Sequence, residues 1–140
     1  MPADFIDSNV VLYLFDEVND LKRGVAETLV SQALETDQAS ISFQVVQETL
    51  NVITRKLATP ATPEDAQRFL DSVLAPLWRV MPSLELYQRG LAIQGRYRFG
   101  FYDALIIAAA LEAGCTRLYS EDLQHGQQIE GLTIVNPFLT

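Results

Sequence analysis

Short apolar runs alternate along the chain with longer segments whose apolar residues recur every three or four positions. Such runs predict buried strands, and the longer periodic segments predict amphipathic helices. In the first half, residues 3–7 predict a strand, and Ser8 or Asn9 can cap the helix that follows. Asp20 can cap a second helix that ends near residue 35, residues 39–43 predict the next strand, and a further helix ends near residue 57.

The second half of the chain continues this alternation. Residues 59–63 predict a loop in which Thr62 can cap a helix and Pro63 takes the first helical position. We expect a strand over residues 77–81, a helix over 84–96, and short strands over 117–120 and 132–135. Residues 102–113 predict a helix that is apolar on nearly every face and closed by Gly114, so this helix belongs in the interior.

The order of these elements predicts an α/β fold. Strands that alternate with helices form a parallel sheet that is covered on both faces, with right-handed crossovers. We therefore expect a three-layer α/β/α arrangement with a central parallel sheet of about four to five strands. A length of 140 residues is typical of one domain, and no internal repeat or linker divides residues 1–140.

Composition restricts where the protein works and what it binds. Cys115 is the only cysteine, so the chain has no disulfide framework, and a buried thiol suits a reducing cytoplasm. The N-terminus lacks a basic region followed by an apolar stretch, and no apolar run approaches the roughly 18 residues of a membrane span. We therefore expect a soluble cytoplasmic protein with no membrane partner.

The net charge of −8 disfavours loose binding to nucleic acid, because lysine and arginine supply most contacts to phosphates. If four of the 18 acidic residues held two divalent cations, that charge would be halved. We expect that the chain would need metal, a local arginine patch or a partner subunit to hold a nucleic acid.

Four carboxylates stand where the predicted fold gathers functional groups. Ligands of open parallel sheets bind beyond the carboxyl ends of the strands, where the strand order reverses. Asp7 ends the first strand, Asp122 follows a later one, and Asp103 opens the buried helix. Glu48 lies in mid-helix, on one face with two valines. Clustered carboxylates repel one another unless a cation holds them ionised, so together these acids predict a cation site.

Each acid taken singly has a simpler explanation. Asp7 and Asp103 can be helix N-caps. Glu48 can form an ion pair with a basic side chain such as Arg55, and Asp122 can be solvated loop charge. The prediction of a site therefore depends on the joint placement of all four acids.

The ligand types also predict which metal is bound. Carboxylates without supporting histidine or cysteine favour Mg²⁺ or Mn²⁺ over zinc or copper. His125 is the only histidine, which argues against a zinc site. Acidic sites of this kind commonly catalyse phosphoryl chemistry, in which metal activates a water and offsets charge on the attacking and leaving oxygens.

The segments that carry these acids resemble the motifs of PIN-domain nucleases. They are FIDSNVVL at residues 5–12, the helix bearing Glu48, FYDALIIAAA at 101–110 and LYSEDL at 118–123. The likeness covers nearly the whole chain in order and spacing, and it is nearest to the toxin subunits of VapBC-type toxin–antitoxin pairs. The residues NPF at 136–138 also resemble that subgroup.

This resemblance implies a PIN-like domain that acts as a divalent-metal-dependent endoribonuclease and hydrolyses RNA phosphodiester bonds. It also implies a homodimer and a cognate antitoxin whose C-terminal segment lies in a groove near the active site. RNA as the substrate is implied by the resemblance alone, because metal activation does not require a 2′-hydroxyl.

The resemblance assigns roles position by position. It makes Asp7, Glu48 and Asp103 the core metal ligands, with Asp122 as a fourth acid that binds metal directly or through water. Supporting polar positions, which orient the acids or hold water and phosphate, are matched by Asn9 and Ser120. Family members often have threonine at the latter position, and serine retains the hydroxyl. All four acids are present, so we expect an active enzyme.

Three arginines can have either a binding role or an ordinary surface role. Arg89, Arg96 and Arg98 can hold phosphate or an acidic antitoxin residue, or can be solvated or ion-paired on the surface.

A PIN-like module that binds RNA or protein without cutting is the alternative function, and the complete acid set argues against it. Receiver and haloacid-dehalogenase-type domains fit poorly, because a late-strand lysine is missing and Asn9 stands where the second acid would be.

Overall fold

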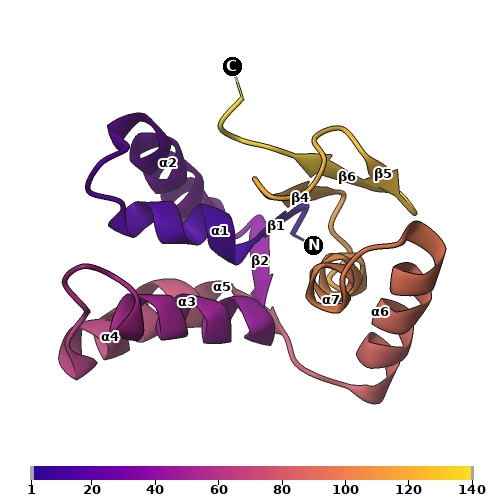
Figure 1. Ribbon diagram of the computed structural model, residues 1–140, viewed down its shortest axis with the longest axis horizontal. Coiled ribbons are helices and arrows are strands. Elements are labelled where there is room, and N and C mark those ends of the chain that lie inside the picture. The colour runs from indigo at the N-terminus through magenta and orange to yellow at the C-terminus, as the bar shows by residue number, and fades with distance from the viewer. Residues whose placement is uncertain (1, 140) are drawn as a thin grey trace.

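A six-stranded sheet lies between two layers of helices in the computed structural model, which describes residues 2–139 (Figure 1). The strand order is β3-β2-β1-β4-β6-β5, and every neighbouring pair is parallel except β5 and β6. The strands are β1 (Asp4–Ile6), β2 (Ala39–Ser42), β3 (Trp78–Val80), β4 (Arg117–Tyr119), β5 (Gln128–Ile129) and β6 (Leu132–Val135).

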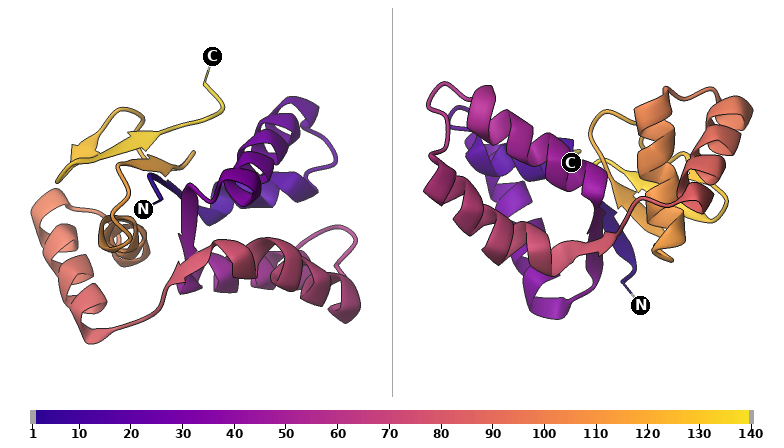
Figure 2. Two further views of the ribbon diagram at one scale, coloured as in Figure 1. Left: turned by 180° about the vertical axis from the view of Figure 1, so that it is seen from behind. Right: turned by 90° about the horizontal axis from the view of Figure 1, so that it is seen from below.

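The helices α6 and α7 lie on one side of the sheet, and the helices from α1 to α5 lie on the other (Figures 1 and 2). This arrangement confirms the expected three-layer α/β/α fold. The helices are α1 (Ser8–Val11), its 3-10 continuation η1 (Leu12–Phe15), α2 (Asp20–Thr36), α3 (Phe43–Arg55), α4 (Pro63–Phe69), the π-helical η2 (Leu70–Leu74), α5 (Ala75–Leu77), α6 (Leu84–Tyr97) and α7 (Phe101–Glu112).

The sheet is one to two strands larger than expected, because β5 was missed. This strand has only two residues and pairs with β6 across a turn formed by Glu130 and Gly131, both at positive φ. Positive φ at both positions defines a type I′ hairpin turn, for which Asn-Gly or Asp-Gly is the usual sequence. The hairpin was not predicted because its first turn position is a glutamate, Glu130.

The cap of α1 is Asp7, the alternative to Ser8 or Asn9, and the cap of α2 lies one residue before the predicted Asp20. Asp7 caps α1 by accepting a hydrogen bond from the Ser8 amide, and Asn19 caps α2 by accepting one from the Lys22 amide. Thr62 caps α4 as expected, with Pro63 at the first helical position. A carboxylate that ends a strand can therefore also begin the next helix.

The helix α7 forms the middle of the core, as its apolar sequence predicted. Residues 104–110 are all buried. Small residues let α6 pack closely against it, since a Cβ added at Gly90 would lie 3.3 Å from Leu105 Cδ1. After α7, Gly114 adopts a φ of 77° and turns the chain towards β4, and the nearby Cys115 is buried as expected.

The strand order reverses between β1 and β4. From β1 the chain extends the sheet through β2 to β3, and it then returns to place β4 on the other side of β1. The carboxyl ends of these two parallel strands meet at one edge, where Asp7 and Ser120 follow directly. Such a switch point is where open α/β sheets bind ligands.

Within residues 2–139, no helix is both long and apolar enough to cross a lipid bilayer.

Candidate active site

Asp7 is the most buried of the four acids and lies at the switch point. This residue is only 6% exposed. One carboxylate oxygen accepts a hydrogen bond from the Ser8 amide at 2.7 Å, and the other accepts one from Ser120 Oγ at 2.9 Å. Three elements, β1, α1 and the end of β4, thus fix the orientation of this carboxylate.

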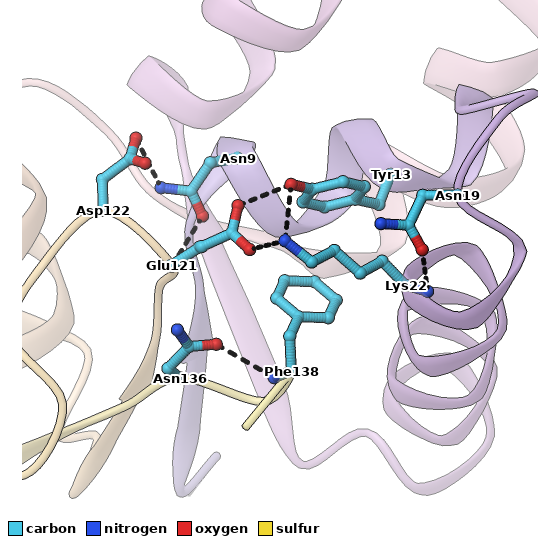
Figure 3. A network of polar contacts seen from close by, with 8 residues as sticks. All are labelled: Asn9, Tyr13, Asn19, Lys22, Glu121, Asp122, Asn136 and Phe138. Atoms are coloured by element: carbon cyan, nitrogen blue, oxygen red, sulfur yellow. Dashed lines mark hydrogen bonds and ion pairs between the residues drawn. The ribbon is translucent and has the colours of Figure 1, made fainter. Parts of the chain in front are cut away.

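Asn9 connects Asp7 to Asp122. Its side-chain nitrogen lies 3.2 Å from Asp7 Oδ2, 3.1 Å from Asp122 Oδ2 and 3.3 Å from Ser120 Oγ. Its side-chain oxygen accepts a hydrogen bond from the Glu121 amide at 3.1 Å. Asn9 therefore holds the loop after β4 against α1, and Figure 3 shows its contacts with Glu121 and Asp122.

Glu48 reaches the same site from α3. Its carboxylate accepts a hydrogen bond from Ser8 Oγ at 2.9 Å, and Gln44 Nε2 lies 3.5 Å from its second oxygen. The salt bridges among residues 2–139 include none to Glu48, so the simpler explanation of a pair with Arg55 is not met.

Asp103 lies in the first turn of α7 and is not its cap. The N-cap is Gly100, whose lack of a side chain leaves the helix start without a side-chain hydrogen bond. Among the described residues, the Asp103 carboxylate has no hydrogen-bond or ion-pair partner. The simpler explanation of Asp103 as an N-cap is therefore wrong, and its carboxylate is exposed and available to a ligand.

The four acids influence one another electrostatically. Burial is the main cause that raises the pKa of Asp7 from 3.8 to about 6, and the nearby charges of Glu48 and Asp103 add to it. Partial desolvation of the Asp103 carboxylate, and then the charge of Asp122, also raise its pKa. Repulsion between like charges thus contributes to the raised pKa of both Asp7 and Asp103.

These residues fit a divalent cation by their chemistry. In the conformation of residues 2–139, no three His, Cys, Asp or Glu side chains are arranged as ligands of one ion. The donor set nevertheless consists of oxygen atoms, as Mg²⁺ and Mn²⁺ require, and it lacks a Lys or Arg partner within the same range. A buried carboxylate with a raised pKa gains most from a cation, and Asp7 is such a group.

Glu121, the neighbour of Asp122, has a different partner. Its carboxylate pairs with the Lys22 ammonium and accepts a hydrogen bond from the Tyr13 hydroxyl at 2.6 Å (Figure 3). Burial raises the pKa of Glu121, but the hydrogen bonds from Lys22 and Tyr13 together lower it by more. The pKa of Glu121 therefore lies below its usual value. Glu121 is therefore neutralised by the protein, whereas Asp122 is not.

The same network attaches the C-terminal segment to the site. The Phe138 ring packs edge-on against Tyr13, with 4.8 Å between ring centroids, and Lys22 Nζ lies over the Phe138 ring at 5.4 Å. The Phe138 amide donates to Asn136 Oδ1 at 2.9 Å. The segment that resembles the toxin subgroup thus packs against Tyr13 and Lys22, the two side chains that bind Glu121.

Several of these supporting residues were not identified from the sequence. Ser8 and Gln44 both hold Glu48, and the position of Gln44 four residues earlier on the same helix could have indicated this. Lys22 and Glu121 are 99 residues apart, and no local pattern predicts their pairing.

Two of the three arginines make surface contacts. Arg89 lies 3.9 Å from Glu130, Arg96 lies over the Tyr97 ring, and Arg98 adopts a left-handed conformation at the end of α6. The first two contacts fit the surface alternative considered above, and a role in holding phosphate stays a prediction.

The family model of the PIN domain matches residues 5–127. This range includes all four acids and most of the sheet, and the chain belongs to the PIN-domain family. The resemblance drawn from the motifs is thereby confirmed at the level of the family.

Solved structures with the same fold include subunits of toxin–antitoxin complexes. A toxin–antitoxin complex from Klebsiella pneumoniae contains a chain with 22% identity and a TM-score of 0.69, covering 96% of this chain and 98% of that one. The DNA-bound VapBC from Salmonella typhimurium matches with 18% identity and a TM-score of 0.66, covering 96% and 97%. VapC20 from Mycobacterium tuberculosis, described as a toxin that cleaves the sarcin–ricin loop, matches with 18% identity and a TM-score of 0.62, covering 86% and 90%. A search of curated protein sequences found no match.

Proposed function

We propose that this chain is a divalent-metal-dependent endoribonuclease that hydrolyses RNA phosphodiester bonds as the toxin of a toxin–antitoxin pair. The observation that carries the proposal is the arrangement at the switch point. There Asn9 and Ser120 tie the buried carboxylate of Asp7 to the loop that bears Asp122. Glu48 and Asp103 complete a group of four acids without a cationic partner among residues 2–139.

The four acids would hold Mg²⁺ or Mn²⁺, with Asp7, Glu48 and Asp103 as core ligands and Asp122 as the fourth. A divalent ion at such a site activates water and offsets negative charge on phosphate oxygens. The protein's own contribution is to fix the ligands. Ser120 and the Ser8 amide orient Asp7, and Ser8 Oγ orients Glu48. Hydrogen bonds of this kind around metal ligands are often worth 10- to 100-fold in metal affinity or activity.

The relatives support the proposed substrate and partners. VapC20 is described as a toxin that cleaves an RNA loop, and other structural neighbours were solved as toxin–antitoxin complexes. We therefore propose RNA as the substrate and an antitoxin protein as the inhibitor. We also propose that residues 1–140 act as one nuclease domain, as a homodimer in the cytoplasm.

The test is the cleavage of total cellular RNA by purified, antitoxin-free protein in Mg²⁺ or Mn²⁺ and in EDTA. We expect cleavage with either metal and none with the chelator, because the ion supplies the activated water and charge stabilisation. Circular dichroism in EDTA checks that the protein stays folded. Intact RNA in every lane from folded protein would contradict the proposal and favour the non-cleaving PIN-like binding module.

A further inference from the structure

A small polar hollow opens beside the acid group, between α3 and the start of α7. It has a volume of about 310 Å³ and is lined by Gln44, Gln47, Glu48, Asn51 and Tyr102. These five residues are called the Tyr102 hollow below. The four residues from α3 are spaced so that they share one face of that helix. Glu48 belongs both to the hollow and to the acid group, so the two are continuous.

Tyr102 forms an exposed aromatic wall of this hollow. The residue is 66% exposed and directly precedes Asp103 in the first turn of α7. Its ring packs edge-on against Phe101, with 5.3 Å between centroids. A single exposed aromatic residue is not unusual, but this one adjoins Asp103 and lines the hollow that also contains Glu48.

The remaining walls offer hydrogen bonds of both kinds. Gln44, Gln47 and Asn51 are amides, which donate and accept together. Gln44 is 4% exposed, and its Nε2 is bound to the Tyr102 carbonyl at 3.2 Å, while its Oε1 has no partner among residues 2–139. The exposed amides in the lining, those of Gln47 and Asn51, are therefore the ones open to a ligand.

The charge of the hollow decides which part of a substrate can enter. It has no lysine or arginine in its lining, and it contains the Glu48 carboxylate. A phosphate would be repelled there, whereas an uncharged group with polar edges and a flat face would be accepted. Unpaired nucleobases have this chemistry, since they stack on aromatic rings and bond to amides through their edges.

We propose that the Tyr102 hollow binds one unpaired nucleobase of a single-stranded RNA, while the scissile phosphate lies at the four acids. This inference rests on the proposed function, because it takes the acid group to be the cleavage site. The Tyr102 hollow would also explain which RNA sequences are preferred as substrates. The ring of Tyr102 supplies stacking that every base can use, and the amides supply preference among bases. A folded duplex would be a poor substrate, since its bases are already stacked and paired.

The experiment measures binding separately from cleavage. Fluorescein-labelled oligoadenylate, oligouridylate and oligocytidylate of about ten nucleotides are titrated with protein in Ca²⁺, and anisotropy gives each Kd. The variants are Tyr102→Ala, Tyr102→Phe and Tyr102→Trp, with Tyr87→Ala as a matched control from the exposed face of α6. Cleavage in Mg²⁺ supplies kcat and KM for the same proteins.

Base–aromatic stacking predicts a loss of about 10- to 100-fold in affinity for Tyr102→Ala, appearing mainly in KM. We expect Tyr102→Phe and Tyr102→Trp to bind like the parent, because each retains a stacking face, and Tyr87→Ala to have no effect. An affinity that is equal in the parent and in Tyr102→Ala, including no binding by either, would overturn the inference. So would a change in oligomeric state with RNA binding unchanged, because the hollow would then contact a protein.

These outcomes separate the inference from the proposed function. If the parent cleaves RNA and Tyr102→Ala retains both affinity and KM, the nuclease stands and the base site is wrong. If the parent binds RNA through Tyr102 but never cleaves it in any metal, the base site stands and the nuclease is wrong.

Discussion

Replacing Asp103 with asparagine is expected to reduce RNA cleavage by at least about 1,000-fold while the protein remains folded. The loss of a metal ligand removes several kcal/mol of charge stabilisation from the transition state, and each 1.36 kcal/mol is tenfold in rate. The fold should tolerate the change, because Asp103 is exposed and its carboxylate has no partner among residues 2–139. Cleavage of a defined RNA, followed by gel in Mg²⁺, gives the rate ratio.

Glu85→Gln is the matched control for this variant. Glu85 lies in the first turn of α6 as Asp103 lies in the first turn of α7, so both substitutions remove a helix-terminal charge. Only Asp103 belongs to the acid group. We therefore expect the Glu85 variant to cleave at the parental rate. Parental cleavage by Asp103→Asn would remove Asp103 from the ligand set.

The second large effect concerns stability. In EDTA at pH 7.5, Asp7→Asn is expected to be more stable than the parent by about 1–3 kcal/mol. Burial raises the pKa of Asp7 from 3.8 to about 6, so at neutral pH the folded protein carries a carboxylate that burial disfavours. Asparagine removes the charge but weakens the hydrogen bonds from Ser8 and Ser120, which lowers the gain. Urea unfolding measures the difference.

The stability difference between Asp7→Asn and the parent should depend on pH. A carboxyl group whose folded pKa is raised contributes stability below about pH 4 and loses that contribution as the pH rises through about 6. The advantage of Asp7→Asn should therefore grow between pH 4 and 7. Added Mn²⁺ should reverse the order at pH 7.5, because an ion that binds only the folded parent stabilises it. An advantage that is the same at pH 4 and 7.5 would contradict this explanation.

The sequence predicted the layers of the fold because hydrophobic periodicity and element order are local properties. The π-helical turn of η2 and the short strand β5 were not predicted, since their departures from regular patterns span only a few residues. Asp7 caps α1 in place of Ser8 or Asn9, and Asn19 caps α2 in place of Asp20, because adjacent polar side chains compete for the same amides.

The sequence could predict the positions of the candidate acids, because each position follows from the order of strands and helices. Asp7 and Asp122 follow strands that meet at the switch point, and Asp103 begins the helix packed beside them. The contacts that position them were not predictable, because they join distant segments. Asn9 reaches Asp122 across 113 positions, and Lys22 reaches Glu121 across 99. Nothing local showed that Glu121 would be neutralised while Asp122 would not.

The most direct measurement for the central claim is the anomalous scattering of Mn²⁺ in crystals of the protein. We expect a peak within about 2.5 Å of carboxylate oxygens from Asp7, Glu48 and Asp103, with Asp122 bound directly or through water. The peak should vanish in Asp103→Asn crystals soaked in the same way. A parent crystal that binds Mn²⁺ elsewhere, or leaves these four acids without a peak at saturating metal, would contradict the account.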